Sequence, residues 1–165
     1  MVVLPEKLKE ALDGPTAVLI ATIQPDGSPQ VNPVWLGRDG DQLLISTVVG
    51  RRKYLNLKRD PRLTVVYMNG PEASVYAEMR GTATMTTEGG AELIDRLSRV
   101  YTGLPYLEFN KYGDADEGLR VVIRMTVTKL LGSFNMEERM TPEQLKKTLA
   151  AAANFPSRRA ASSTN

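Results

Sequence analysis

The chain has 165 residues, of which 42% are hydrophobic, and a formal net charge of +2. This length predicts one domain with a full hydrophobic core. No stretch approaches the roughly 20 apolar residues that cross a bilayer. The first residues carry the charges of Glu6, Lys7, Lys9 and Glu10, unlike the apolar region of a signal peptide. We therefore expect a cytoplasmic protein that binds no membrane, and the mild charge gives no reason to expect nucleic acid.

The sequence contains no cysteine and no histidine. The lack of cysteine excludes disulfides, thiolate metal sites and a cysteine nucleophile. The lack of histidine removes the commonest general base, the Ser-His-Asp triad and most zinc or haem sites. We expect no metal site, and composition alone names no catalytic residue.

The first predicted element is a helix in which Leu4, Leu8 and Leu12 recur every four residues, ended by Gly14 and Pro15. Strand-like segments follow, and turn dipeptides that favour tight hairpins separate several of them. These dipeptides are Asp26-Gly27, Asp39-Gly40 and Asn69-Gly70. The segments are 16–23, 30–36, 42–47, 63–68, 74–85 and 121–131. Short turns make such strands antiparallel, and six of them predict a mainly β barrel or sandwich.

Three further helices are predicted from the sequence. Residues 50–59 form a short basic helix, and residues 92–101 place their apolar side chains on one stripe. The last helix begins at Thr141, where Pro142 and Gln144 complete a plausible capping box. The polar tail after Phe155 is expected to be disordered.

A strand end followed by a basic helix start is the most informative feature. Ser46-Thr47 precedes Gly50, and Arg51-Arg52-Lys53 then opens the helix. Cations are unfavourable at a helix N-terminus, where the dipole is already positive. Three together make sense if hydroxyls, helix N–H groups and cations converge on a phosphate. The alternative interpretation is a solvated basic helix on the surface.

The segment Gln30-Val31-Asn32-Pro33-Val34-Trp35 is the second feature. Pro33 cannot donate to a β-ladder, so it belongs at an edge or an interruption of pairing. Exposed backbone beside the single tryptophan would suit a planar ring. The alternative is an edge strand with Trp35 in the core. A later aromatic group, Tyr101, Tyr106, Phe109 and Tyr112, either lines a substrate pocket or covers a barrel end.

In their order, these motifs resemble the pyridoxamine-phosphate-oxidase-like FMN-binding split-barrel family, specifically its deazaflavin (F420)-dependent branch. The matching segments are Ala21-Thr22, Asp26-Gly27-Ser28-Pro29, Val31-Asn32-Pro33-Val34-Trp35, Leu43-Leu44-Ile45-Ser46-Thr47, Gly50-Arg51-Arg52-Lys53-Tyr54-Leu55-Asn56-Leu57, Asp60-Pro61-Arg62 and Gly81-Thr82-Ala83. The likeness runs from about Leu8 to about Gly132. It implies a six-stranded antiparallel split β-barrel with flanking helices over residues 1–135, and nothing is transferred to residues 136–165.

The resemblance also implies where a cofactor binds. The strand Asn32, Pro33, Val34 and Trp35 would contact the ring system. Ser46, Thr47, Arg51 and Lys53 would bind phosphate and the polyol chain, and Arg52 would meet the acidic tail of coenzyme F420. Gly50 and Asn56 complete the expected cofactor-binding set. Family members are homodimers with two cofactors in grooves between the subunits.

The function that the resemblance implies is an oxidoreductase in which reduced coenzyme F420 transfers hydride to an unsaturated small molecule. The alternatives are FMN as the cofactor, or a non-enzymatic flavin or deazaflavin carrier. True pyridoxamine phosphate oxidation is disfavoured, because the further basic and histidine residues that hold that substrate are not found. The substrate and the proton donor are left open.

Overall fold

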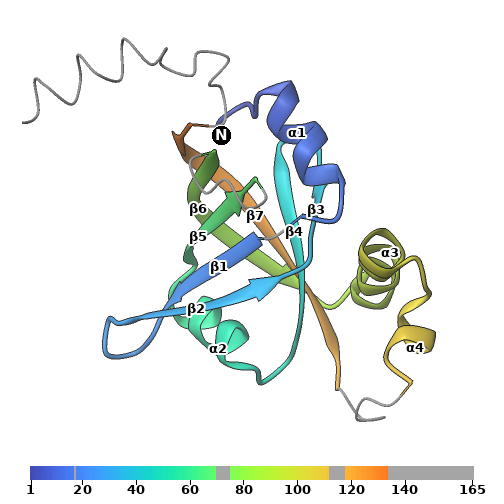
Figure 1. Cartoon of the computed structure of the whole chain (residues 1–165). Coiled ribbons are helices and arrows are strands. Elements are labelled where there is room, and N and C mark those ends of the chain that lie inside the picture. The colour runs from blue at the N-terminus through green and yellow to red at the C-terminus, as the bar shows by residue number, and fades with distance from the viewer. Residues whose placement is uncertain (17, 70–74, 112–117, 134–165) are drawn as a thin grey trace, which may run out of the picture. The chain divides into compact units, whose positions relative to one another are not determined.

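The computed structural model describes residues 1–16, 18–69, 75–111 and 118–133. Within them, seven strands form one antiparallel sheet in the order β2-β1-β5-β6-β7-β4-β3 (Figure 1). The strands are β1 (Val18–Ile23), β2 (Pro29–Val34), β3 (Leu36–Asp39), β4 (Gln42–Val48), β5 (Arg62–Met68), β6 (Tyr76–Thr86) and β7 (Arg120–Gly132). The helices are α1 (Glu6–Asp13), α2 (Arg52–Arg59), α3 (Gly90–Thr102) and α4 (Tyr106–Phe109).

The predicted fold class, a mainly β split barrel with flanking helices, is confirmed, with one strand more than expected. The predicted strand 30–36 is divided, because β2 ends at Val34 and β3 begins at Leu36. β2 pairs with β1, whereas β3 pairs with β4. These are the two outermost strands, and only Trp35 separates them. The sheet must therefore curl until its two edges meet at Trp35.

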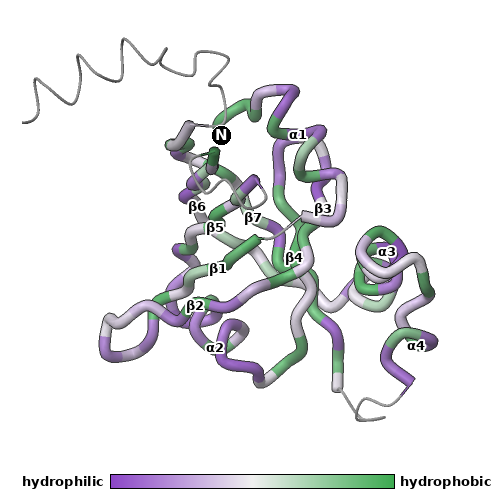
Figure 2. Tube along the Cα trace, viewed as in Figure 1, coloured by the Kyte–Doolittle hydropathy of each residue, from purple (hydrophilic) through white to green (hydrophobic). Residues whose placement is uncertain are grey.

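The main hydrophobic core lies inside this curl. Strand β1 alternates buried and half-buried residues, as a strand with one face on a core does. Leu8 and Leu12 of α1 and Leu57 of α2 close onto the same core. Its fully buried members include Leu4, Leu8, Leu12, Ile20, Leu36, Leu43, Ile45, Met79, Ile123 and Met125. Hydrophilic residues make up much of α2 (Figure 2).

A second, smaller core lies between α3 and the sheet. Leu93 and Leu97 of α3 pack against Leu44 of β4 and Val122 of β7. Helix α3 ends at Thr102 and is followed by Gly103, whose φ of 78° is the left-handed conformation that glycine adopts at helix ends. The amphipathic helix predicted over 92–101 is thus confirmed, and it supports the strand junction at Trp35 from outside the barrel.

Several predictions fall outside the described residues. These are the turn at Asn69-Gly70, whose glycine is not described, the helix from Thr141, the polar tail, and Tyr112 of the aromatic group. In the part of the chain that the structure describes, no helix is both long and apolar enough to cross a membrane. Nor do the described ranges contain a group of three or more histidine, cysteine, aspartate or glutamate residues arranged to hold a metal ion.

Candidate functional site

A tight turn joins β4 to α2 and sets the direction of the helix start. Gly50 has a φ of 86°, which side-chain-bearing residues rarely adopt. The N–H of Arg51 donates to the carbonyl of Val48 over 3.2 Å. The helix therefore begins at Arg52, two residues later than predicted, with Arg51 at the cap position. Its N-terminus follows directly from the strand that carries Ser46 and Thr47.

The first turn of α2 contains cations but no acidic residue, and no side chain caps it. Arg51 and Arg52 are exposed, whereas Lys53 is half-buried. Burial lowers the pKa of the Lys53 ammonium, and the positive charge of Arg51 lowers that pKa further. Both effects disfavour the charged form of Lys53 when no anion is bound. An anion beside these groups would reverse the second effect and occupy the free N–H groups of the helix start.

Ser46 and Thr47 carry hydroxyl oxygens that are buried and have no hydrogen-bond partner among the described residues. Thr47 is only 1% exposed. Buried polar atoms are nearly always satisfied, so each needs an explanation. Successive strand residues point to opposite faces, so the two hydroxyls cannot both face one small anion, as the sequence interpretation assumed. Thr47 lies on the face of Ile45 and the main core, and Ser46 on the face of Leu44 and the second core.

A relay of side-chain hydrogen bonds connects α2 to β2. The amide of Asn56, only 2% exposed, donates to Thr22 Oγ1 over 3.0 Å. Thr22 donates to Gln30 over 3.0 Å, and Gln30 donates to Asn32 over 2.9 Å. The Asn32 amide ends the relay on the carbonyl of Pro33 over 2.8 Å. The structure thus places Asn56 inside the protein and links it to the predicted ring-binding strand, and a direct cofactor contact by Asn56 stays a prediction.

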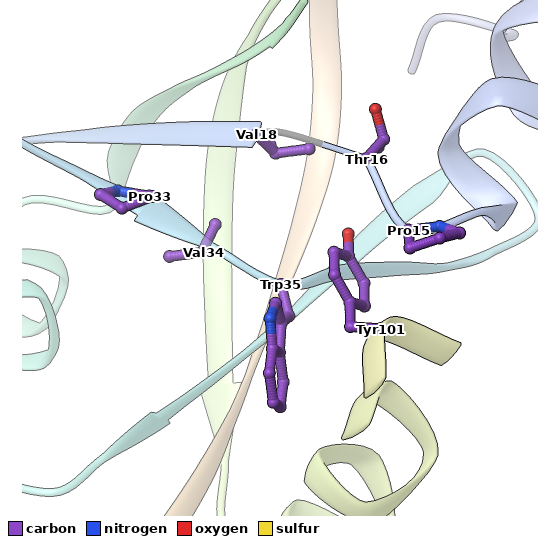
Figure 3. Close-up of a pocket in the computed structure, with 7 residues that line it drawn as sticks. All are labelled: Pro15, Thr16, Val18, Pro33, Val34, Trp35 and Tyr101. Atoms are coloured by element: carbon purple, nitrogen blue, oxygen red, sulfur yellow. The ribbon is translucent and has the colours of Figure 1, made fainter. Parts of the chain in front are cut away.

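A pocket of about 620 Å³ opens where β2 ends, a volume typical of small-molecule sites. Pro33, Val34 and Trp35 of the predicted ring-binding strand line it (Figure 3). Its other lining residues are Pro15, Thr16, Val18 and Tyr101. The start of β1 was not predicted to take part, because barrel closure alone brings it to the pocket and no local motif signals it.

Trp35 forms one wall of the pocket and is held by aromatic side chains from two helices. Its ring stacks on Tyr101 of α3, with centroids 5.5 Å apart and planes 23° apart. Phe109 of α4 packs against it at 5.3 Å with a tilt of 54°. Tyr106 lies apart, with its ring 4.6 Å from the Arg120 guanidinium carbon. The aromatic group therefore divides: Tyr101 lines a pocket, and Phe109 supports the wall.

The outward face of β2, β1 and β5 presents an apolar surface. Directly paired residues lie on the same face of a sheet, and Leu19 pairs with both Pro33 and Val66. Val31, which pairs with Ala21, is 53% exposed. A surface of this kind on a sheet points to association with another molecule.

Comparison with known proteins gives these features a context. The family model for pyridoxamine 5'-phosphate oxidase matches residues 4–133. The chain is 28% identical to a solved F420 reductase, covering 78% of this chain and 98% of that one, with a TM-score of 0.65. It is 25% identical to the conserved hypothetical protein Rv2991 from Mycobacterium tuberculosis, with a TM-score of 0.60. That match covers 78% of this chain and 84% of the other.

A third solved structure shares the fold at a greater distance. It is a putative pyridoxamine 5'-phosphate oxidase from Listeria innocua, 17% identical, covering 76% of this chain and 94% of that one, with a TM-score of 0.56. The family model spans well over half of the chain, including both the strand junction at Trp35 and the start of α2. The chain therefore belongs to the pyridoxamine 5'-phosphate oxidase family, as the order of its sequence motifs predicted.

Proposed function

We propose that the protein is an oxidoreductase that uses reduced coenzyme F420 to transfer hydride to an unsaturated small molecule. The observation that carries the proposal is the start of α2, whose first turn has cations, no acidic residue and no side-chain cap, with two buried hydroxyls that have no partner among the described residues on the strand before it. The family match supports a flavin-type oxidoreductase in general. The likeness to an F420 reductase favours the deazaflavin form of that cofactor over FMN.

The residues present fit such a cofactor in two separate places. The helix start with Arg51, Arg52 and Lys53 would hold the phosphate and the acidic tail by charge-assisted hydrogen bonds. The strand 33–35 with the aromatic wall would receive the planar ring. Because Ser46 and Thr47 face opposite sides of the sheet, only one of them would contact a phosphate at the helix start. The cofactor, when bound, supplies the hydride chemistry, and the protein supplies position and electrostatics.

Direct titration of the purified protein with coenzyme F420 and with FMN tests this proposal. We expect F420 to bind, with quenching of its fluorescence, more tightly than FMN. Tight FMN binding without F420 binding would contradict the cofactor choice. The reduced, loaded protein should then be oxidised by at least one enone, quinone or tetrapyrrole; failure of every acceptor would favour a carrier.

We also propose a two-fold homodimer with the cofactor site between the subunits. The outward apolar face of β2, β1 and β5 supports this, because a second copy of that face would cover Leu19, Val31 and Val66. A stable interface needs more than about 1,000 Å² of buried surface. Sedimentation velocity at micromolar concentration should give a dimer. A monomer would count strongly against a shared site.

A further inference from the structure

Tyr101 is the only titratable side chain among the described residues that line the pocket beside Trp35. The other lining side chains are hydrocarbon, the indole of Trp35 and the hydroxyl of Thr16. A charged group of a ligand would find no counter-ion among these side chains. The pocket therefore suits an uncharged ring with hydrogen-bond acceptors better than a charged group.

The hydroxyl of Tyr101 is held so that its proton can be given to a ligand. Its oxygen accepts the N–H of Leu36 over 3.0 Å. For its own proton, the acceptor in the structure is the carbonyl of Leu36 at 3.4 Å, well beyond the usual length for an O–H donor. A hydroxyl that accepts one bond becomes a better donor for the next. The stacking of its ring on Trp35 fixes the position of this donor.

We propose that Tyr101 donates a hydrogen bond to a carbonyl oxygen of the planar ring bound in this pocket. The inference rests on the proposed function for the identity of this ring, which belongs either to the cofactor or to the substrate. If the ring is that of a substrate with a conjugated carbonyl, its oxygen gains negative charge as the substrate accepts the hydride, and a fixed donor at that oxygen stabilises the charge where it develops. If the ring is that of the cofactor, the same hydrogen bond fixes its orientation in the pocket.

The first arm of the test uses protein without cofactor. Equilibrium dialysis with 2-acetylnaphthalene and 2-ethylnaphthalene compares two flat ligands that differ chiefly in the carbonyl. Tyr101→Phe should weaken binding of the ketone about 3- to 10-fold and leave that of the hydrocarbon unchanged. A general disturbance of the pocket would weaken both ligands equally. Because Trp35 is the only tryptophan, an unchanged emission maximum in the variant shows that the pocket wall is intact.

The second arm titrates coenzyme F420 and FMN into the parent and into Tyr101→Phe, recording affinity and the absorption maximum of the bound ring. If Tyr101→Phe binds the cofactor more weakly but the ketone as well as the parent does, the carbonyl belongs to the cofactor. If Tyr101→Phe binds only the ketone more weakly, the carbonyl belongs to a substrate. Either loss supports the proposal. If the parent binds the ketone but no cofactor, the proposed function is wrong. Weaker ketone binding by Tyr101→Phe would still show that Tyr101 is a donor.

The control is Tyr106→Phe. The Tyr106 hydroxyl contacts Arg120 over 2.5 Å and does not line the pocket, so this variant should match the parent in both arms. The proposal is overturned if Tyr101→Phe matches the parent in both arms, if Tyr106→Phe causes the same losses, or if the parent binds neither ring nor ketone.

Discussion

Replacing Lys53 by alanine should weaken cofactor binding by about 1.5–3 kcal/mol, roughly ten- to a hundredfold. Lys53 is the half-buried cation of the α2 start, and its charge meets no acidic residue in that turn. Anion binding would supply the missing partner. Calorimetric titration of the parent and of Lys53→Ala with F420 or FMN measures the loss.

The same substitution should not lower the free energy of unfolding, although it weakens binding. Burial and Arg51 lower the pKa of Lys53, so without bound cofactor the unfolded chain holds this proton more tightly than the folded protein does. The free energy of unfolding of the parent should therefore rise with pH between the lowered pKa and the ordinary value of 10.5. Lys53→Ala should lose that rise and be at least as stable as the parent at neutral pH.

Lys58→Ala is the matched control. Lys58 is exposed in the last turn of the same helix, where a cation interacts favourably with the dipole. We expect almost unchanged affinity and a small loss of stability. If both variants bind like the parent, α2 is a solvated basic helix and the phosphate site is wrong.

Local patterns were enough to predict most of the fold. Asp26-Gly27 and Asp39-Gly40 do form the tight turns between β1 and β2 and between β3 and β4, with positive φ at Gly27 and Gly40. The break at Trp35 could not be predicted, because a one-residue interruption between two strands needs no turn residue. It arises from closure of the sheet, which depends on pairings far apart in the sequence.

The candidate site also has parts that local sequence patterns could predict and parts that they could not. The basic start of α2 is local and was visible as a run of three cations after a glycine. The opposite orientation of Ser46 and Thr47 follows from the two-residue period of a strand and could have been predicted. The approach of Thr16 and Tyr101 to Trp35 could not, because it depends on how α3 and β1 meet across the barrel.

We expect the curl of the sheet to depend on Gly81, in the middle of the long strand β6. The pairing of β6 with β7 shifts register between Arg80 and Gly81, which leaves Thr128 as an extra residue on β7. Bulges of this kind bend a sheet. Gly81 is buried where the two backbones approach closely. A Cβ atom there would overlap the carbonyl oxygen of Thr126 and lie 2.9 Å from its carbonyl carbon.

Gly81→Ala should therefore destabilise the protein by about 3 kcal/mol or more and lower the melting temperature by roughly 10 °C. The obstacle is backbone in the centre of the sheet, so no rotamer change relieves it. Gly14→Ala is the control, since Gly14 has an ordinary φ of −94° and an added methyl group would meet nothing within 4 Å; its melting temperature should match or slightly exceed the parent's. Thermal unfolding followed by circular dichroism compares the three proteins. Equal melting of Gly81→Ala and the parent would mean that the strands can separate at the bulge, and the close approach of β6 and β7 would not be what holds the curl.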